Sequence, residues 1–193
     1  MDIPPNENIS AIVSYASTQI NADQNADKRG NISENPLSNP RESAFLVMAT
    51  KLGIIKKTPL KEFSAVRKTG IIAIKLRKND SLNWVRISSG QAEIFLTSAK
   101  GQSIRFSEKQ VRSMGRVSAG VIGIKIKTDD ALSSMDIIES EKGKERKVLV
   151  VMDKGFAKQT SLKAYRKQKR GGRGIKTAKI TNKTGEIISA HHI

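Results

Sequence analysis

The fold is decided by LVMATKLGIIKKTPLKEF at residues 46–63, because its pattern returns as IFLTSAKGQSIRFSEKQV at 94–111 and as VLVVMDKGFAKQTSLKAY at 148–165. Gly53, Gly101 and Gly155 share one position of this pattern, at spacings of 48 and 54 residues. Repeats of this length predict a propeller or a similar array, in which each repeat forms one supersecondary unit.

Each repeat contains a second glycine, at Gly70, Gly120 and Gly174, and a run with alternating apolar residues follows it. Alternation with a period of two predicts short strands. The first glycines should mark hairpin tips, and Leu60–Phe63 is expected to hold at most a short helix or turn. We therefore predict an all-β, propeller-like fold (a β-pinwheel) with four-stranded blades, about three complete and one partial.

The expected blades follow the repeats. The second blade includes a charged insert, and the third carries a loop of sequence QKRGGRG. The three blades span residues 45–90, 91–146 and 147–193.

The start of the chain has a different composition. Glu7 and Ile9 match the acid and the apolar residue near the end of each repeat, so residues 1–15 are expected to hold the terminal strand of a truncated blade. Residues 16–44 are rich in Asn, Ser, Asp and Pro and are expected to form a polar disordered loop.

The positive charge lies in the repeats. Residues 45–193 carry 32 Lys and Arg against 12 Asp and Glu, a net charge of +20, whereas residues 1–44 carry three against six. So basic a surface predicts binding to a polyanion through phosphate contacts.

Aromatic residues make up only 4% of the chain, and no recognition helix is predicted. Sequence-tolerant binding to duplex DNA is therefore favoured over stacking on single strands or reading of bases.

The most basic loop is Gln168–Gly174, which has three cations, three glycines and no acid. Glycine lets the backbone approach a ligand closely, and Lys and Arg supply charge and donors that match phosphate. The candidate DNA contacts are this loop and the cations beside other repeat glycines and turns: Gln168, Lys169, Arg170, Gly171, Gly172, Arg173, Gly174, Arg166, Arg112, Arg116, Lys56, Lys57, Arg67 and Lys68.

No residues for catalysis, cofactors or metals are expected. Tyr15 and Tyr165 are interpreted as structural, Asp80 and Asp130 as turn residues, and His191–His192 as neighbours on opposite sides of a strand. The sequence has no cysteine and no P-loop pattern, so disulfides, thiolate metal sites and ATP binding are not expected. It also has no signal peptide and no long apolar run, so it is expected neither to be secreted by that route nor to contact a membrane. The lack of cysteine fits the cytoplasm, and the expected DNA binding predicts a nucleoid-associated location.

Three motifs in the repeats resemble those of a known protein family. LVMATKLGIIKKTPLKEFSAVRKTGIIAIKL at 46–76, Arg112–Arg116 with Gly120, and KAYRKQKRGGRGIKT at 163–177 resemble the carboxy-terminal domain of the bacterial DNA gyrase A protein. Gln168–Gly174 is similar to the gyrase A box of that family. The resemblance covers about four-fifths of the chain.

The resemblance implies a β-pinwheel that wraps duplex DNA and so supports ATP-dependent negative supercoiling by the whole enzyme. The implied partners are double-stranded DNA, the remainder of the gyrase A protein, and the gyrase B protein. ATP and magnesium would belong to other parts of the enzyme, as would the cleavage tyrosine, so this chain is expected to be non-catalytic by itself. No small-molecule substrate is expected.

Other interpretations remain open. The chain could instead belong to the A-type component of topoisomerase IV, or be a stand-alone architectural protein that bends DNA. A protein-binding propeller of the WD type is disfavoured, because the sequence has no Trp-Asp dipeptide and a strongly positive charge.

Overall fold

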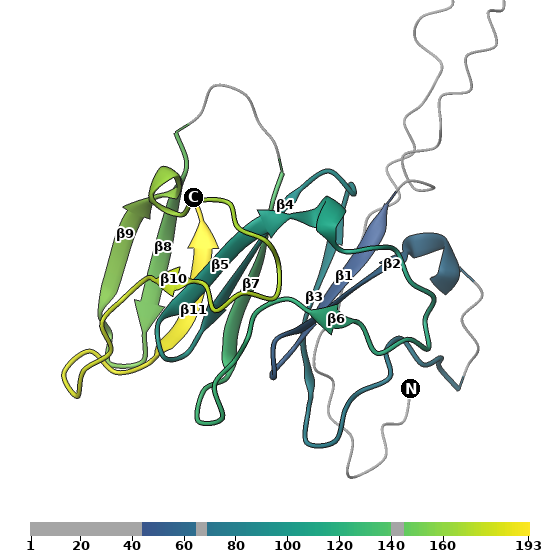
Figure 1. The fold of residues 1–193 in the computed structure, drawn as a ribbon, viewed down its shortest axis with the longest axis horizontal. Helices are drawn as coiled ribbons and strands as arrows, with labels where there is room; N and C mark the ends of the chain where they lie inside the picture. The colour runs from purple at the N-terminus through teal and green to yellow at the C-terminus, as the bar shows by residue number, and fades with distance from the viewer. Residues whose placement is uncertain (1–43, 65–68, 140–144) are drawn as a thin grey trace, which may run out of the picture.

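The computed structural model describes residues 44–64, 69–139 and 145–193, and every structural statement below concerns these residues. In this part of the chain, eleven strands form three antiparallel sheets that stand in a row (Figure 1). Three short 3₁₀ helices lie between the strands. The all-β, propeller-like prediction is therefore confirmed. The expected partial blade at 1–15 and almost all of the expected polar loop at 16–44 lie outside the described residues.

The described strands have the order β3-β1-β2-β6 in the first sheet, β10-β5-β4-β7 in the second and β11-β8-β9 in the third. The elements are β1 (Phe45–Thr50), β2 (Ile54–Pro59), η1 (Leu60–Phe63), β3 (Leu82–Ser88), β4 (Glu93–Ser98), β5 (Gln102–Ser107), η2 (Glu108–Gln110), β6 (Val121–Ile122), β7 (Leu132–Ile138), β8 (Lys147–Met152), β9 (Ala157–Ser161), η3 (Leu162–Ala164), β10 (Ile175–Lys176) and β11 (Ile187–His192).

The fourth strand of a sheet comes from the following repeat. The second-repeat strand β6 pairs with β2 of the first repeat, with Ile54 opposite Ile122, and the third-repeat strand β10 pairs with β5 of the second, with Ser103 opposite Ile175. The prediction that each repeat folds its own four strands is wrong in this respect. In the second and third repeats, the segment after the second glycine instead pairs with the sheet of the preceding repeat and so joins two neighbouring sheets.

Tight turns make this exchange possible. Gly120 has a φ of 83°, a left-handed conformation that glycine adopts without steric cost. A Cβ atom at this position would lie 2.7 Å from the carbonyl oxygen of Ile55 in the neighbouring sheet. Gly120 is therefore needed both for the turn and for the close approach of the two backbones.

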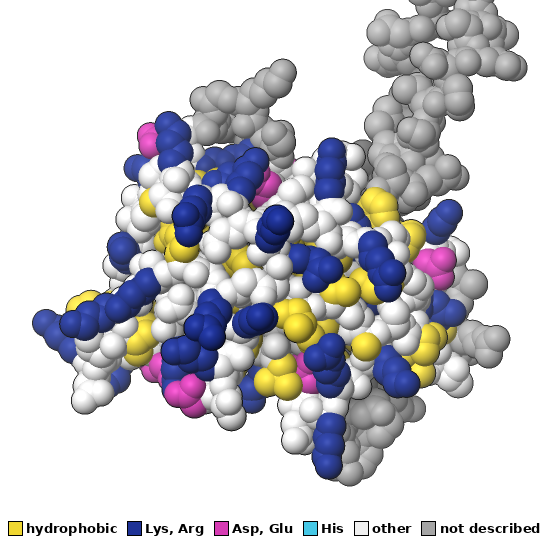
Figure 2. Space-filling view, viewed as in Figure 1, with side chains coloured by type: hydrophobic (Ala, Val, Ile, Leu, Met, Phe, Trp, Pro, Cys, Tyr) yellow, Lys and Arg dark blue, Asp and Glu magenta, His cyan; other side chains and the backbone are white. Residues whose placement is uncertain are grey.

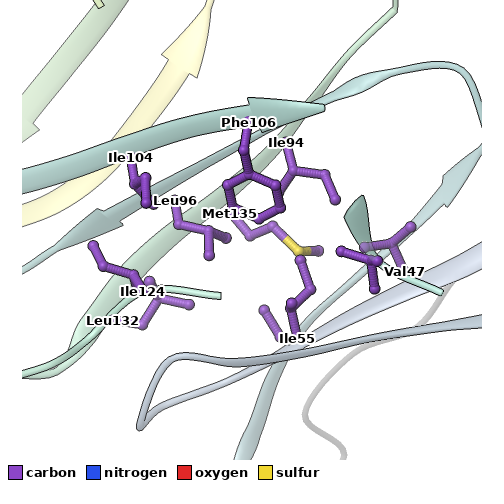
Figure 3. Packing of buried hydrophobic residues seen from close by; sticks show 11 residues of the cluster. Val47, Ile55, Ile94, Leu96, Ile104, Phe106, Ile124, Leu132 and Met135 are labelled. Carbon is purple, nitrogen blue, oxygen red and sulfur yellow. The ribbon is translucent and has the colours of Figure 1, made fainter. Parts of the chain in front are cut away.

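The core lies between the sheets. Successive residues of a strand point to opposite faces, so the middle sheet contributes side chains to the clusters on both of its sides. Val47 of β1 packs between the first and second sheets. Phe95, which has the same repeat position in β4, packs between the second and third sheets. Figure 3 shows the first of these clusters, in which Val47 and Ile55 of the first sheet meet Ile94 and Leu96 of the second.

The acids in the repeats close the hairpins, as predicted. Asp80 Oδ1 accepts hydrogen bonds from the backbone N–H groups of Leu52 and Ser81, both at 2.9 Å. Asp130 Oδ1 accepts equivalent bonds from Lys100 at 3.0 Å and from the following residue at 2.8 Å. These carboxylates stabilise turns, which explains them without a bound metal ion.

Candidate nucleic-acid interface

Two loops, residues 111–120 and 165–174, lie across the sheet formed mainly by the preceding repeat. The backbone N–H of Met114 donates to the carbonyl of Lys57 at 2.9 Å, and that of Gln168 donates to the carbonyl of Arg105 at 2.8 Å. Met114 and Gln168 have the same repeat position, as do Lys57 and Arg105. In Figure 1 both loops reach over the neighbouring sheet before they enter β6 and β10. The two basic loops are therefore held in equivalent places.

Gln110 fixes the start of the QKRGGRG loop. Its amide nitrogen donates to the carbonyl of Gln168 at 3.2 Å, and its amide oxygen accepts from the backbone N–H of Arg170 at 2.9 Å. Further along, Gly171 N–H donates to Gly123 O at 2.6 Å. The loop thus has a defined backbone path over the second sheet.

Arg170 belongs to this anchoring. Its guanidinium group donates from Nε to the carbonyl of Gln110 at 2.9 Å and from Nη1 to the carbonyl of Ile122 at 3.1 Å. By contrast, Lys169 and Arg173 are exposed and have no side-chain partner within the described ranges. Of the three cations predicted to contact phosphate, two are therefore free to do so, and the third also holds the loop.

The other loop has the matching arginines. Arg112 has the same repeat position as Arg166, and both are exposed. Arg116 corresponds to Arg170, and both are half-buried. The predicted sites in the two loops therefore lie at equivalent places on neighbouring sheets. Arg67 and Lys68 lie outside the described residues.

Lys56 and Lys57 are inside the protein, so the prediction that they contact DNA is wrong. Lys56 is 0% exposed and its ammonium group donates to the carbonyls of Ala73, at 2.7 Å, and Arg116. Lys57 is 6% exposed and its Nζ lies 3.5 Å from Glu108 Oε1 and 4.8 Å from the centre of the Phe45 ring. Both faces of β2 are covered, because its neighbours are another sheet and the 111–120 loop.

A partly buried ion pair, extended by the exposed Lys167, supports the second loop. Arg105 Nε lies 2.5 Å from Glu93 Oε2, and its Nη1 donates to the carbonyls of Leu162, at 3.0 Å, and Tyr165, at 3.2 Å. Lys167 pairs with the other oxygen of Glu93. Burial raises the pKa of Glu93, but the hydrogen bonds and charges of Lys167 and Arg105 outweigh burial and hold this pKa below its usual value. The cluster joins the second sheet to the third repeat.

Sequence reasoning missed one regular feature of this surface. Lys75, Lys125 and Lys179 each follow the second glycine of a repeat by five residues, and all three are exposed. The backbone N–H of Lys125 donates to Gly172 O at 2.8 Å, beside the QKRGGRG loop, and that of Lys75 donates to Ser118 O at 3.1 Å, beside the other loop. Aligning the repeats residue by residue would have revealed that all three have a lysine at this position.

Cations far outnumber acids on one face of the described residues. Figure 2 shows Lys and Arg side chains over the whole visible face, which carries β6 and β10, with few Asp or Glu side chains among them. In the described ranges there is no helix of sufficient length and hydrophobicity to cross a membrane. Nor do these ranges hold a cluster of three or more His, Cys, Asp or Glu residues suited to a metal ion.

The tyrosine and the two histidines considered in the sequence analysis contact other residues of the protein. Tyr165 is 3% exposed and stands edge-on to Phe95, with ring centres 5.0 Å apart, so it belongs to the core. His191 and His192 both approach Asp136 Oδ2, with their Nδ1 atoms at 4.0 and 2.7 Å. These distances do not test whether the two rings face opposite sides of the strand, which stays a prediction. The buried Asp136 carboxylate also accepts the backbone N–H of His192, and this strand end brings both rings to one oxygen.

The fold and surface define a class of protein: a propeller-like array whose basic loops are carried on the edges of its sheets. A family model described as the DNA gyrase C-terminal domain, beta-propeller, matches residues 44–89, 92–139 and 147–193. The chain belongs to this family.

Relatives with known names agree with this assignment. The DNA gyrase A protein of Staphylococcus epidermidis (strain ATCC 12228 / FDA PCI 1200) is 43% identical over 147 residues, which are 76% of this chain and 16% of that protein. The DNA gyrase A protein of Staphylococcus aureus (strain MRSA252) is 40% identical over the same length. The chain thus spans about a sixth of the length of these curated relatives.

Solved structures show the same architecture. A DNA gyrase A C-terminal domain matches with a TM-score of 0.69 and 26% identity, over 77% of this chain and 48% of that one. The C-terminal domain of a DNA topoisomerase IV matches equally well, with a TM-score of 0.69 and 27% identity, over 75% of this chain and 44% of that one.

Proposed function

We propose that this chain binds double-stranded DNA with little sequence preference and wraps it along the basic loops, as a non-catalytic part of DNA gyrase. The whole enzyme would use the wrapped DNA for ATP-dependent negative supercoiling. On this proposal the partners are duplex DNA, the remainder of the gyrase A protein, and the gyrase B protein, and the chain works in the cytoplasm at the nucleoid.

The observation that carries the proposal is the equivalent placement of the loops at 111–120 and 165–174. Each is tied by backbone hydrogen bonds to the sheet before it, and each presents an exposed arginine at its start, Arg112 or Arg166. Lys75 and Lys125 lie beside these loops and extend the set of exposed cations. Cations repeated from sheet to sheet suit a ligand whose phosphates repeat along a curved path, and they read no base sequence.

Topoisomerase IV is the nearest competing assignment, since its C-terminal domain has the same fold. The family model and the relatives with 40–43% identity favour gyrase. A free-standing DNA-bending protein would use the same surface. Co-purification with the rest of gyrase distinguishes this alternative from the proposal.

The direct test compares two exposed arginines. Arg173 lies in the QKRGGRG loop, whereas Arg86 lies on β3, at the opposite edge of the first sheet from β6. We expect Arg173→Ala to weaken duplex binding about two- to fivefold at low salt, and Arg86→Ala to change it by less than about twofold, since only the first charge lies on the proposed DNA path. Both variants should keep the stability of the parent.

The assay uses fluorescence anisotropy with one short duplex, and circularisation or energy transfer with a longer one. Wrapping needs several loops at once, so Arg173→Ala should reduce bending of the long duplex more than binding of the short one. Equal losses for Arg173→Ala and Arg86→Ala would mean that the charge acts as a diffuse field and that the loops are not the wrapping path.

A further inference from the structure

One hairpin glycine faces open space where its repeat equivalents touch a neighbouring strand. A Cβ atom at Gly53 would lie 2.6 Å from Ile124 O, and one at Gly101 would lie 2.5 Å from Ala178 O. At Gly155, which has the same repeat position, no atom lies within 4 Å of such a Cβ. The three φ angles are 79°, 89° and 78°, so the turns are alike and only the neighbour differs.

A second glycine shows the same difference. A Cβ at Gly120 would lie 2.7 Å from Ile55 O, and one at Gly174 would collide with Ser103 O. At Gly70, the equivalent position in the first repeat, there is again nothing within 4 Å. Its φ of 77° matches the 83° and 76° of the other two. Gly70 therefore begins a segment shaped to lie against a strand, with no such strand beside it among the described residues.

The two open sites are complementary. The strand that covers Gly53 or Gly101 is the segment that follows the second glycine of the next repeat. Residues 70–76 are the equivalent segment of the first repeat. The edge of β9 beside Gly155 is equivalent to the edges of β2 and β5, which receive such a segment. Within one copy the two sites belong to the first and third sheets, which stand at opposite ends of the row (Figure 1).

Burial agrees with this interpretation on the β9 side. Ala157 is exposed, whereas the residues at its repeat position, Ile55 and Ser103, are both 0% exposed. In β8, Leu149 is half-buried, whereas its equivalent Phe95 is 2% exposed. The outer side of the third sheet thus lacks the cover that the inner sheets have.

The 70–76 segment also exposes apolar side chains. Ile72 is 62% exposed and Leu76 is 44% exposed. Ile126 and Ile180, the equivalents of Leu76, instead pack against the clusters between the sheets. Exposed apolar groups on a segment that no strand pairs with are typical of a surface that another chain covers.

We propose that a second copy of this chain adds its residues 70–76 to the outer edge of β9, head to tail. The register follows that of β6 on β2 and β10 on β5, which places Ile72 of one copy opposite Phe156 of the other. The contact joins unlike surfaces of two identical chains, so it closes into a ring or continues as a short array. This association is independent of the proposed DNA binding and goes beyond it.

The association is weaker than the contacts between sheets inside the chain. Lys56 and Thr58 of the first sheet occupy the repeat positions of Ile104 and Phe106 in the second, and other segments of the same chain already bury both, so the outer side of the first sheet has less apolar surface left to offer. Hydrophobic stabilisation scales with apolar area removed from water, so we expect a dissociation constant in the micromolar range. The positive charge of both copies opposes their association. Moderate salt screens this repulsion and should therefore strengthen the association.

The test uses one lesion at each end of the proposed contact, Gly70→Asn or Gly155→Asn. Asparagine tolerates the left-handed backbone of both turns, and its side chain blocks the close approach of a strand. Sedimentation equilibrium of the 193-residue chain, without DNA, should show concentration-dependent association of the parent. Each variant alone should associate about ten- to a hundredfold more weakly, as expected for overpacking at a tight contact.

Mixing the two variants gives the sharpest result. The Gly155→Asn chain keeps an intact 70–76 segment and the Gly70→Asn chain keeps an intact β9 edge, so one productive contact remains. We expect the mixture to form a one-to-one dimer and nothing larger. Gly115→Ala is the matched control, since a Cβ there meets nothing within 4 Å and its φ is not left-handed, and it should associate like the parent.

Hydrogen exchange provides a readout that does not depend on the variants. Amides in 70–76 and in β9 should gain protection as the concentration of the parent rises. The proposal is overturned if the parent stays monomeric throughout, if protection appears elsewhere, or if the mixed variants fail to pair while the parent associates. It is also overturned if each variant alone associates as strongly as the parent.

Discussion

Lys56 shows how the structure changes the role of a single residue. Its side chain has no contact with solvent and ties the Ala73 segment to the loop that contains Arg116. Burial lowers the pKa of Lys56 from 10.5 to about 8, and the charge of Arg116 contributes to the same shift. A cation expected to bind phosphate is therefore an internal clamp that holds the first basic loop.

This pKa gives the stability a defined pH dependence. Between about pH 8 and pH 10.5 the unfolded chain keeps the proton on Lys56 while the folded chain loses it, so the free energy of unfolding rises with pH in this window. We expect a rise of about 1–3 kcal/mol from this group. Urea unfolding of the parent and of Lys56→Met measures it, and the variant should lack this part of the rise. Parallel curves for the two proteins would contradict the assignment.

Arg170 gives a second prediction at the scale of a residue. Its guanidinium group joins the carbonyls of Gln110 and Ile122, and lysine cannot make both bonds with the same geometry. Arg170→Lys should therefore keep the charge but lower the free energy of unfolding by about 0.5–1.5 kcal/mol. Thermal unfolding measures this change, and Lys169→Arg is the control that should leave stability unaltered. A fully stable Arg170→Lys protein would show that the anchor is unimportant.

The sequence could predict the basic loops but not which cations are exposed. Lys56 and Lys57 stand beside a hairpin glycine, as an exposed pair would, and period-two alternation places one of them on each face of β2. Both are buried because neighbouring segments cover both faces, and those segments come from another repeat. The regular row of Lys75, Lys125 and Lys179 was readable from the sequence alone, because its spacing from the second glycine is constant.

At the scale of elements, the exchange of a short strand joins each repeat to the one before it. β6 and β10 are only two residues long, yet each completes a sheet whose other strands belong to the preceding repeat. The repeats correctly predicted short strands at Val121–Ile122 and Ile175–Lys176, but the equivalent run of the first repeat, residues 72–76, forms no strand in the structure. They could not predict which sheet receives the fourth strand, since so short a strand has no partner signal of its own. The tight glycine contacts became visible only in the structure.

Two equivalent glycines test the exchange. Gly101→Ala would strain a left-handed turn and press a Cβ against Ala178 O of the donated segment, and together these should cost about 2–4 kcal/mol of unfolding free energy. Gly155→Ala strains an equivalent turn without the contact and should cost about 1 kcal/mol. Urea unfolding at low protein concentration measures both. Equal losses would show that the backbone conformation alone requires glycine and that the donated segment does not press on it.

At the scale of the whole molecule, neighbouring sheets carry the two described basic loops at equivalent places. Each loop is fixed to the sheet before it, so the spacing between loops is set by the packing of the sheets. Flexible basic tails would neutralise phosphates as well, but they would not impose a curve on the DNA. The proposed function depends on this combination of charge and rigid spacing.

DNA binding through the basic loops is tested most directly by the salt dependence of duplex binding, measured for the parent and for the double variant Lys169→Ala/Arg173→Ala. For the parent, the plot of log affinity against log salt should have the slope of several phosphate contacts, each contributing about −0.9. The double variant should fold normally and lose about two contacts' worth of slope. A flat slope for the parent, or the same slope for both proteins, would contradict DNA binding through these loops.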